Sequence, residues 1–277
     1  MNKLLTLALI LLCWASNAQP IKMMTYNIRY ANDNDGENVW DNRKSKVVQL
    51  INYYEPLVFG IQEGLEKQVK YLDESLDSYD YVGVGRDDGK TKGEYSAVFY
   101  NTQALEVLEN STFWLSETPD KISKGWDASL ERICTYARFK NKKTGKTFWV
   151  FNTHFDHRGE EARKNSAKLI LEMINKKTNL GTDKVVFMGD LNLVPEHEAI
   201  ATIKSQLDDS KTTSEKAPYG PVGTSNGFKT DLVMTRRIDY IFTKNLKVKE
   251  YVQIDDRRDD NYYPSDHLPV LVELEGF

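Results

Sequence analysis

The feature that most constrains the fold is a recurring pattern, in which a short apolar segment borders a polar side chain of a kind that enzymes use. These polar residues are Asn27, Glu63, His154, Asp190, Asn192, Asp239, Asp266 and His267. Ligands of α/β proteins bind outside the carboxyl ends of strands. We therefore expect six separate strand ends to converge on one site.

Hydrophobic periodicity predicts both strands and helices along the chain. The predicted strands cover residues 22–28, 57–61, 79–84, 95–100, 105–115, 133–139, 147–152, 184–188, 237–243, 247–254 and 269–273. The predicted helices cover residues 41–54, 65–76, 160–176 and 196–205. Early strand–helix–strand units followed by hairpins indicate an α/β protein with mixed sheets.

The first 18 residues have the layout of a secretory signal peptide. Lys3 precedes an apolar run over residues 4–14, and small residues at 16 and 18 suit cleavage after Ala18. The run is shorter than the roughly 20 apolar residues of a spanning helix, which disfavours an uncleaved anchor. We expect one domain over residues 19–277, exported to the periplasm or beyond, with no stable membrane anchor after cleavage.

Cysteine content and charge restrict the remaining possibilities. After cleavage Cys134 stands alone, within an alternating strand pattern, so we expect a buried core thiol and no internal disulfide. The net charge of −4 argues against a protein that binds long nucleic acid mainly through charge. A local basic groove remains compatible with this composition.

Three of the polar residues suit a divalent cation. Glu63 and Asp266 are hard oxygen ligands of the kind that Mg²⁺ or Mn²⁺ prefers, and Asn27 can add a carbonyl oxygen. A cation held there would neutralise phosphoryl charge and lower the pKa of a water molecule.

The other residues suit proton transfer and phosphate binding. His154 and His267 can move protons or donate hydrogen bonds near neutral pH. Asp190 and Asn192 can position a nucleophilic water molecule and the phosphate, and Asp239 can orient His267.

These residues carry a family resemblance. Residues 25–29, 62–63, 152–154, 189–192, 237–240 and 265–269 resemble, in order, the motifs of the endonuclease/exonuclease/phosphatase superfamily. That superfamily includes DNase I, abasic-site endonucleases, neutral sphingomyelinases, inositol polyphosphate 5-phosphatases and deadenylases. The resemblance implies a DNase I-like, four-layer α/β/β/α fold, which is a two-sheet β-sandwich flanked by helices. Residues 85–89, 113–119 and 125–127 resemble an uncharacterised secreted bacterial branch.

The resemblance also implies roles for the site residues. It implies that Asn27, Glu63 and Asp266 surround the metal. It also implies catalytic roles for His154, Asp190, Asn192, Asp239 and His267. Glu94 lies where relatives keep a glutamate that orients the histidine matching His154, and Arg132 lies where they keep an arginine that contacts phosphate. The alternative for Glu94 and Arg132 is an ion pair at the surface.

The resulting hypothesis is a secreted phosphoesterase that depends on Mg²⁺ or Mn²⁺ and cleaves a phosphodiester or phosphomonoester by in-line attack of water. The alternatives are a nuclease acting on extracellular nucleic acid and a secreted binding module without turnover. Substrate candidates are nucleic acid, nucleotides, sugar phosphates, phosphoglycans and a lipid head group, for which Tyr262 and Tyr263 would supply an apolar hairpin. No obligate protein partner is indicated.

Some polar residues are expected to lie outside the site. His157 precedes the helix over 160–176, where a loop or capping role is expected. His197 begins a helix and is expected to be solvated. The charged run over residues 255–260 is expected to form a solvated loop.

Overall fold

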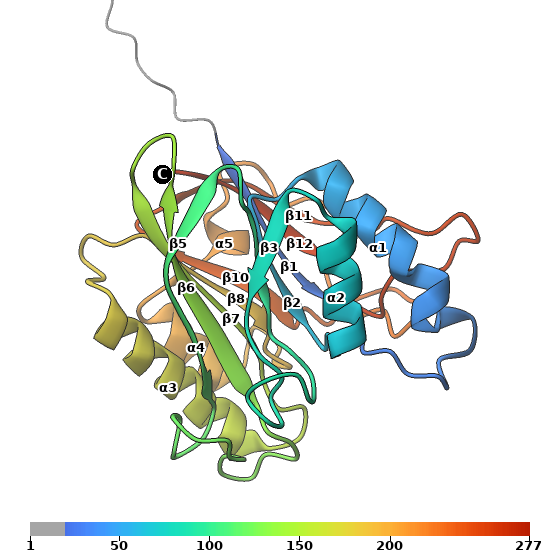
Figure 1. The fold of residues 1–277 in the computed structure, drawn as a ribbon, viewed down its shortest axis with the longest axis horizontal. Helices are drawn as coiled ribbons and strands as arrows, with labels where there is room; N and C mark the ends of the chain where they lie inside the picture. The colour runs from blue at the N-terminus through green and yellow to red at the C-terminus, as the bar shows by residue number, and fades with distance from the viewer. Residues whose placement is uncertain (1–19) are drawn as a thin grey trace, which may run out of the picture.

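Two six-stranded sheets pack face to face in the computed structural model, which describes residues 20–277 (Figure 1). The first sheet has the order β11 (Lys247–Gln253), β12 (Val270–Glu275), β1 (Ile21–Asn27), β2 (Val58–Gln62), β4 (Val98–Asn101), β3 (Tyr79–Val82). The second has the order β5 (Leu105–Trp114), β6 (Ile133–Asn141), β7 (Thr147–His154), β8 (Val185–Asp190), β10 (Asp239–Lys244), β9 (Asp208–Asp209). The predicted signal peptide lies outside the described residues.

Helices cover the outer face of each sheet (Figure 1). Helices α1 (Trp40–Tyr54) and α2 (Glu66–Ser75) pack on the first sheet, and α3 (Glu160–Lys177) and α4 (Glu198–Lys204) pack on the second. A 3₁₀ turn, η1 (Gly36–Asn38), precedes α1, and a short helix, α5 (Ser210–Thr213), follows β9. The predicted four-layer α/β/β/α fold is therefore confirmed.

Three apolar clusters hold the layers together. Between the sheets, Met23 and Val150 belong to one buried cluster. Phe59 and Leu50 join the first sheet to α1, and Ile170 lies in the cluster between the second sheet and its helices. Each such side chain contributes roughly 1.5–3 kcal/mol on burial. Cys134 is fully buried in the cluster beneath α3 and α4, as its strand position predicts.

Strand pairing brings the polar strand ends to one edge of the sandwich. In the first sheet, β1 and β2 are parallel, and Asn27 lies opposite Gln62. In the second sheet, β7 and β8 are parallel with His154 opposite Asp190. Strand β10 runs antiparallel to β8 with Asp239 opposite Asp190, so that three polar residues form one row.

A buried polar bridge fixes the two sheets relative to each other beneath this edge. Asn152 on β7 donates to the carbonyl oxygens of Ile61 and Ala97 at 2.8 and 2.9 Å, and accepts from Gln62 Nε2 at 2.7 Å. A β-carbon at residue 60 would lie 2.5 Å from the Asn152 side chain, so only Gly60 leaves room for the bridge.

The predicted element boundaries differ from the structure at some ends. Strand β4 begins at Val98 because Tyr95 instead forms isolated bridges with Gly64 and Gly85. The two-residue strand β9 and the one-turn helix α5 were not predicted, since such short elements leave no periodic pattern. Within the described residues, none of the helices has the length and hydropathy that a bilayer crossing requires.

We predict that Asn152→Ala lowers the free energy of unfolding by about 3 kcal/mol, because it leaves buried polar groups without partners. Urea denaturation measures this change. The matched control is Asn110→Ala, which removes an exposed amide on β5 and should change stability by less than about 0.5 kcal/mol. Equal effects of the two substitutions would contradict the structural role of the bridge.

Candidate active site

The side chain of Asn27 joins the two sheets at the polar edge. Its Nδ2 donates to Glu63 Oε1 at 3.0 Å, from the first sheet, and to Asp190 Oδ2 at 2.9 Å, from the second. The backbone N–H of Tyr30 donates to Glu63 Oε2 at 3.1 Å. Glu63 has a left-handed φ of 63°, a strained conformation that turns the chain sharply after β2.

Asp190 lies at the centre of the site. Its Oδ1 accepts from the backbone N–H of Asn192 at 2.9 Å, and its Oδ2 lies 3.5 Å from His154 Nε2. Burial, reinforced by the nearby Asp239 carboxylate, raises the pKa of Asp190 to about 7. Gly189 permits this packing, because a β-carbon there would meet the Thr153 carbonyl oxygen at 2.0 Å.

His154 is held as a neutral imidazole. Asn192 Nδ2 donates to the carbonyl oxygen of Phe155 at 3.0 Å and to His154 Nε2 at 3.1 Å. An Nε2 that accepts leaves the proton on Nδ1, which lies 3.8 Å from Glu94 Oε2. Burial, together with the positive charges of Arg132 and Arg86, lowers the pKa of His154 well below its usual range.

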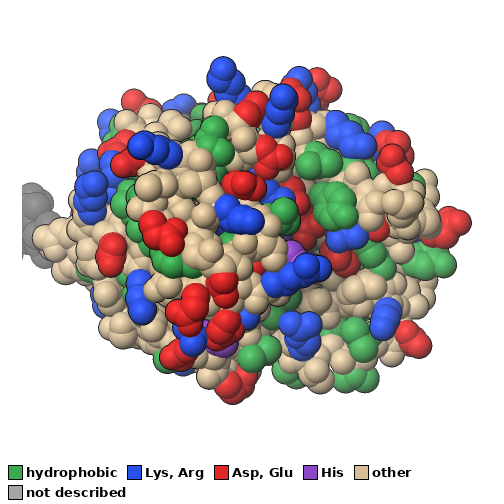
Figure 2. Space-filling model, turned by 90° about the horizontal axis from the view of Figure 1, so that it is seen from below, with side chains coloured by type: hydrophobic (Ala, Val, Ile, Leu, Met, Phe, Trp, Pro, Cys, Tyr) green, Lys and Arg blue, Asp and Glu red, His purple; other side chains and the backbone are tan. Residues whose placement is uncertain are grey.

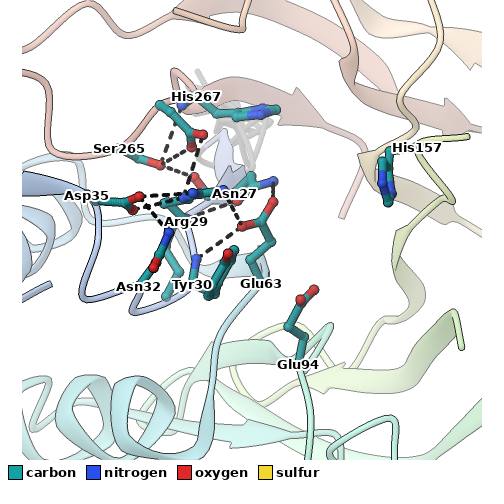
Figure 3. Close-up of polar contacts among 12 residues, drawn as sticks. Asn27, Arg29, Tyr30, Asn32, Asp35, Glu63, Glu94, His157, Ser265 and His267 are labelled. Carbon is teal, nitrogen blue, oxygen red and sulfur yellow. Dashed lines mark hydrogen bonds and ion pairs between the residues drawn. The ribbon is translucent and has the colours of Figure 1, made fainter. Parts of the chain in front are cut away.

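His267 and Asp239 form the closest histidine–carboxylate pair of the site, with His267 Nδ1 2.9 Å from Asp239 Oδ2. Burial disfavours the imidazolium, but the carboxylates of Asp239 and Asp190 outweigh it and raise the pKa of His267 well above its usual range. The adjacent Ser265 hydroxyl donates to the Asn27 carbonyl oxygen at 2.6 Å, which fixes the loop carrying His267 against β1 (Figure 3).

Glu94 is bound by Arg86, which lies in the segment over residues 85–89 and to which sequence analysis assigned no role. Arg86 Nη1 and Nη2 donate to its two carboxylate oxygens at 2.8 and 3.0 Å. Figure 3 shows Glu94 directed toward the space that Glu63 also faces. The alternative of a surface ion pair between Glu94 and Arg132 is wrong, because both are largely buried and Arg132 pairs with Asp156.

Arg132 is held by the loop between β7 and α3. Its Nε donates to Asp156 Oδ2 at 3.4 Å, and its Nη2 donates to His157 Nδ1 at 3.1 Å. The guanidinium is 4% exposed, and its Nη1 is buried without a hydrogen-bond partner. The prediction that His157 lies in a loop is confirmed, but its exclusion from the site is wrong.

These residues surround a pocket of ≈ 360 Å³. It is lined by Arg29, Tyr30, Glu63, Glu94, Leu130, Arg132, His154, His157, Asp190, Asn192 and His267. Figure 2 views the end of the molecule where the loops after β1, β2, β7 and β8 lie. Acidic and basic side chains are interspersed over this face, and histidine atoms show near its centre.

The structure brings the predicted site residues together, although their roles remain predictions. Seven of them line the pocket directly, whereas Asn27 and Asp239 lie behind Asp190 and His267, and Asp266 lies beside Arg29. Sequence analysis assigned no role in the site to Arg29, Tyr30, Leu130 and His157, although Arg29 ends the motif over residues 25–29. The sequence feature that could have pointed to them is their closeness to predicted site residues. His157, for example, lies three positions after His154.

The donor set fits a hard divalent cation. Glu63, His154 and Asp190 offer ligand atoms within 4.8 Å of one another. Asp266 lies outside that group, but the Arg29 guanidinium lies 3.9 Å from both Glu63 and Asp266. Arg29 thus lies between the two carboxylates, with Nη1 near Glu63 and Nε near Asp266. The ligand set of Asn27, Glu63 and Asp266 stays a prediction.

Other predicted surface features differ from the structure. His197 is the N-cap of α4: its Nδ1 accepts from Ala199 N–H, and its Nε2 lies 2.8 Å from Glu160 Oε1, so it is less solvated than expected. In the charged run, Arg258 is buried and binds Asp260. The suggestion that Tyr262 and Tyr263 form an exposed apolar hairpin for a lipid is wrong, because Tyr263 is buried.

We predict that Asp156→Asn destabilises the protein at pH 7 and that the difference shrinks in acid. Burial opposes ionisation, but the backbone N–H groups of Gly159 and Arg158, with Arg132, outweigh it and lower the pKa of Asp156 below its usual range. A lowered pKa gives stability that is present above the unfolded-state pKa and lost as pH falls. Denaturation between about pH 7 and pH 2 tests this, and a pH-independent difference would contradict it.

Comparison with known proteins places this site in a family. A model of the Endonuclease/Exonuclease/phosphatase family matches residues 24–267. An uncharacterized protein of Acanthamoeba polyphaga mimivirus is 30% identical over 252 residues, covering 85% of this chain and 92% of the relative. Nocturnin of Drosophila melanogaster is 23% identical over 281 residues, covering 85% of this chain and 42% of nocturnin.

Solved structures agree with this assignment. A mannosyl-6-phosphatase of Bacteroides thetaiotaomicron is 40% identical, with a TM-score of 0.89 and coverage of 92% of this chain and 100% of that one. The match spans most of the chain and includes the motifs that line the pocket. The chain belongs to the endonuclease/exonuclease/phosphatase family, whose hydrolases act on phosphoric ester bonds.

Proposed function

We propose that the chain is an exported, divalent-metal-dependent phosphatase that hydrolyses a phosphomonoester of a sugar. The observation that carries this proposal is the pocket in which Asp190, Asn192, His267 and Arg132 share one cavity with the carboxylate of Glu63. A phosphate group needs both hydrogen-bond donors and a balancing positive charge, and this cavity offers both.

Two donors for phosphate line the pocket, Arg132 and His267. Arg132 lines the pocket and keeps Nη1 without a partner, although the atom is buried. A buried, unpaired guanidinium N–H is costly unless a ligand supplies the acceptor. A phosphoryl oxygen is such an acceptor, and His267 can donate to the same group from Nε2, since its Nδ1 binds Asp239.

In the proposed mechanism, Asp190 holds the attacking water molecule and takes its proton. Asn27 Nδ2 and the Asn192 backbone N–H fix its carboxylate in place. The water oxygen forms a bond to phosphorus while the bond between phosphorus and the sugar oxygen breaks. The sugar oxygen leaves with the bonding electrons and takes a proton from solvent. His267, oriented by Asp239, stabilises the charge that develops on the phosphoryl oxygens.

A bound Mg²⁺ or Mn²⁺ would neutralise phosphoryl charge. Glu63, Asp266 and Asn27 would hold it, and the adjacent Arg29 would limit the net negative charge of the site.

Two observations support a sugar phosphomonoester as substrate. The mannosyl-6-phosphatase of Bacteroides thetaiotaomicron is similar over the whole of its chain. The pocket, at ≈ 360 Å³, is of a size that suits a small molecule.

The alternative of a nuclease has less support. Binding a nucleic acid strand requires a continuous series of lysine and arginine contacts to phosphates. The face around the pocket instead mixes both signs of charge (Figure 2). Nocturnin shares less than a quarter of its aligned residues with this chain, which supports the fold and not the substrate. A binding module without turnover is disfavoured because every predicted catalytic side chain is present.

Export is part of the proposal and rests on the sequence of residues 1–18. Intact mass measurement of the protein from its native host tests it. A mature chain beginning at Gln19 supports export, and a chain that retains Met1 or its neighbours contradicts cleavage.

We predict that the mature protein hydrolyses a sugar 6-phosphate with Mg²⁺ or Mn²⁺ and that EDTA abolishes this activity. Glu63→Gln and His267→Ala should each lower kcat about 100-fold or more, because they remove cation binding and charge stabilisation. Steady-state kinetics measures kcat, and thermal unfolding verifies that the variants fold.

The matched control is Asn110→Ala, an exposed residue of β5 that does not line the pocket. Full activity in both site variants, or full activity in EDTA, would overturn the proposed site. Turnover of nucleic acid but of no sugar phosphate would favour the nuclease instead.

A further inference from the structure

Two loops form one rim of the pocket, and a single buried carboxylate holds them together. Asp156 Oδ1 accepts from the N–H groups of Arg158 and Gly159 at 2.9 and 2.7 Å, within its own loop. Its Oδ2 accepts from Ser129 and Leu130 N–H at 3.1 and 3.4 Å, across to the loop before β6. The side chain is 1% exposed, so these bonds are shielded from water.

A second contact joins the same two loops to the helix behind them. Asp127 Oδ1 accepts from the N–H of Ala162 in the first turn of α3 at 2.7 Å. Gly159 packs so closely on Asp127 that a β-carbon there would lie 2.6 Å from Oδ1. The rim is therefore anchored on a regular helix, so that the side chains it carries are held in defined positions.

The rim fixes the tautomer of His157. Arginine carries hydrogen-bond donors and no acceptor, so Arg132 Nη2 must donate across the 3.1 Å to His157 Nδ1. An Nδ1 that accepts leaves the proton of the neutral ring on Nε2. Burial and the charge of Arg132 also lower the pKa of His157, which favours the neutral ring. His157 thus presents one N–H donor beyond the arginine.

The exposure of the lining residues separates the floor of the pocket from its rim. Arg132, Asp190 and His154 are buried and form the floor. His157 is exposed, and Leu130 is 39% exposed, although both line the same pocket. Figure 3 shows His157 across the space from Asn27 and Glu63. A phosphoryl group on the floor would leave the rest of the substrate facing this rim.

We propose that His157 is a specificity-determining residue that donates a hydrogen bond from Nε2 to a hydroxyl group of the sugar, while Leu130 contacts the C–H face of the ring. A pyranose ring presents both O–H groups and C–H groups. The N–H donor of His157 can bind the former, and the apolar side chain of Leu130 can contact the latter. This inference rests on the proposed function, because it assigns the alcohol part of the same substrate. Arg132 acts on His157 as a positioning residue.

The test compares two substitutions of His157, each of which keeps one of the two hydrogen-bonding groups of the imidazole. In Asn, the side-chain oxygen replaces Nδ1 and can accept from Arg132, whereas the donor at the position of Nε2 is lost. In Gln, the amide nitrogen replaces Nε2, so the donor is kept. Both are made in an Asp190→Asn background, which prevents turnover during binding measurements. The matched control is His197→Asn, away from the pocket, because Asn is itself a good N-cap for α4.

We expect His157→Asn to weaken calorimetric binding of mannose 6-phosphate about tenfold in Mg²⁺, the effect of losing one hydrogen bond. Binding of inorganic phosphate should change by less than about twofold, since the floor is intact. His157→Gln and His197→Asn should each leave both affinities within about twofold of the background protein.

The outcomes separate this inference from the proposed function. Unchanged affinity for mannose 6-phosphate in His157→Asn would overturn the sugar contact, even if the wild-type protein is an active phosphatase. An equal loss for inorganic phosphate would also overturn it and would place His157 on the phosphate instead. If the affinities change as expected but the protein hydrolyses no ester, the sugar subsite is supported and the proposed phosphatase activity is contradicted.

Discussion

The hydrogen bonds of one side-chain amide connect the parts of this site. Asn27 Nδ2 reaches Glu63 from its own sheet and Asp190 from the other. Because each sheet alone carries part of the constellation, the chemistry depends on their relative position. That position is set below the amide by the buried bridge between Gln62 and Asn152, for which Gly60 makes room. The same polar groups therefore serve both the packing of the sheets and the geometry of the pocket.

The fold and the floor of the site were predictable because they rest on local and repetitive signals. Apolar runs define strands, and parallel pairing of β1 with β2 and of β7 with β8 necessarily brings their carboxyl ends together. The ordered family motifs then identify the functional residues that follow each strand. The longer helices and strands were predicted from the sequence. A two-residue strand such as β9 was not, because it is too short to show a periodic pattern.

The rim was not predictable, for a physical reason. His157 enters the pocket because Asp156 joins its loop to a loop about 27 residues earlier in the chain, through hydrogen bonds to backbone N–H groups. Backbone contacts leave no residue type to recognise in the partner loop. The role of Arg86 was likewise not predicted, since its pairing with Glu94 depends on how the chain turns between β3 and β4. Sequence motifs thus identify the floor of the pocket, whereas backbone contacts between loops form its rim. We infer that the floor binds the phosphate and the rim binds the sugar.

The most direct test of this account is a crystal structure of the mature protein with Mg²⁺ and inorganic phosphate. The account predicts the cation on Glu63 and Asp266, and the phosphate against Asn192, His267 and the free Nη1 of Arg132, with the rim at His157 open. Phosphate bound away from Arg132, or a cation bound without Glu63, would contradict it.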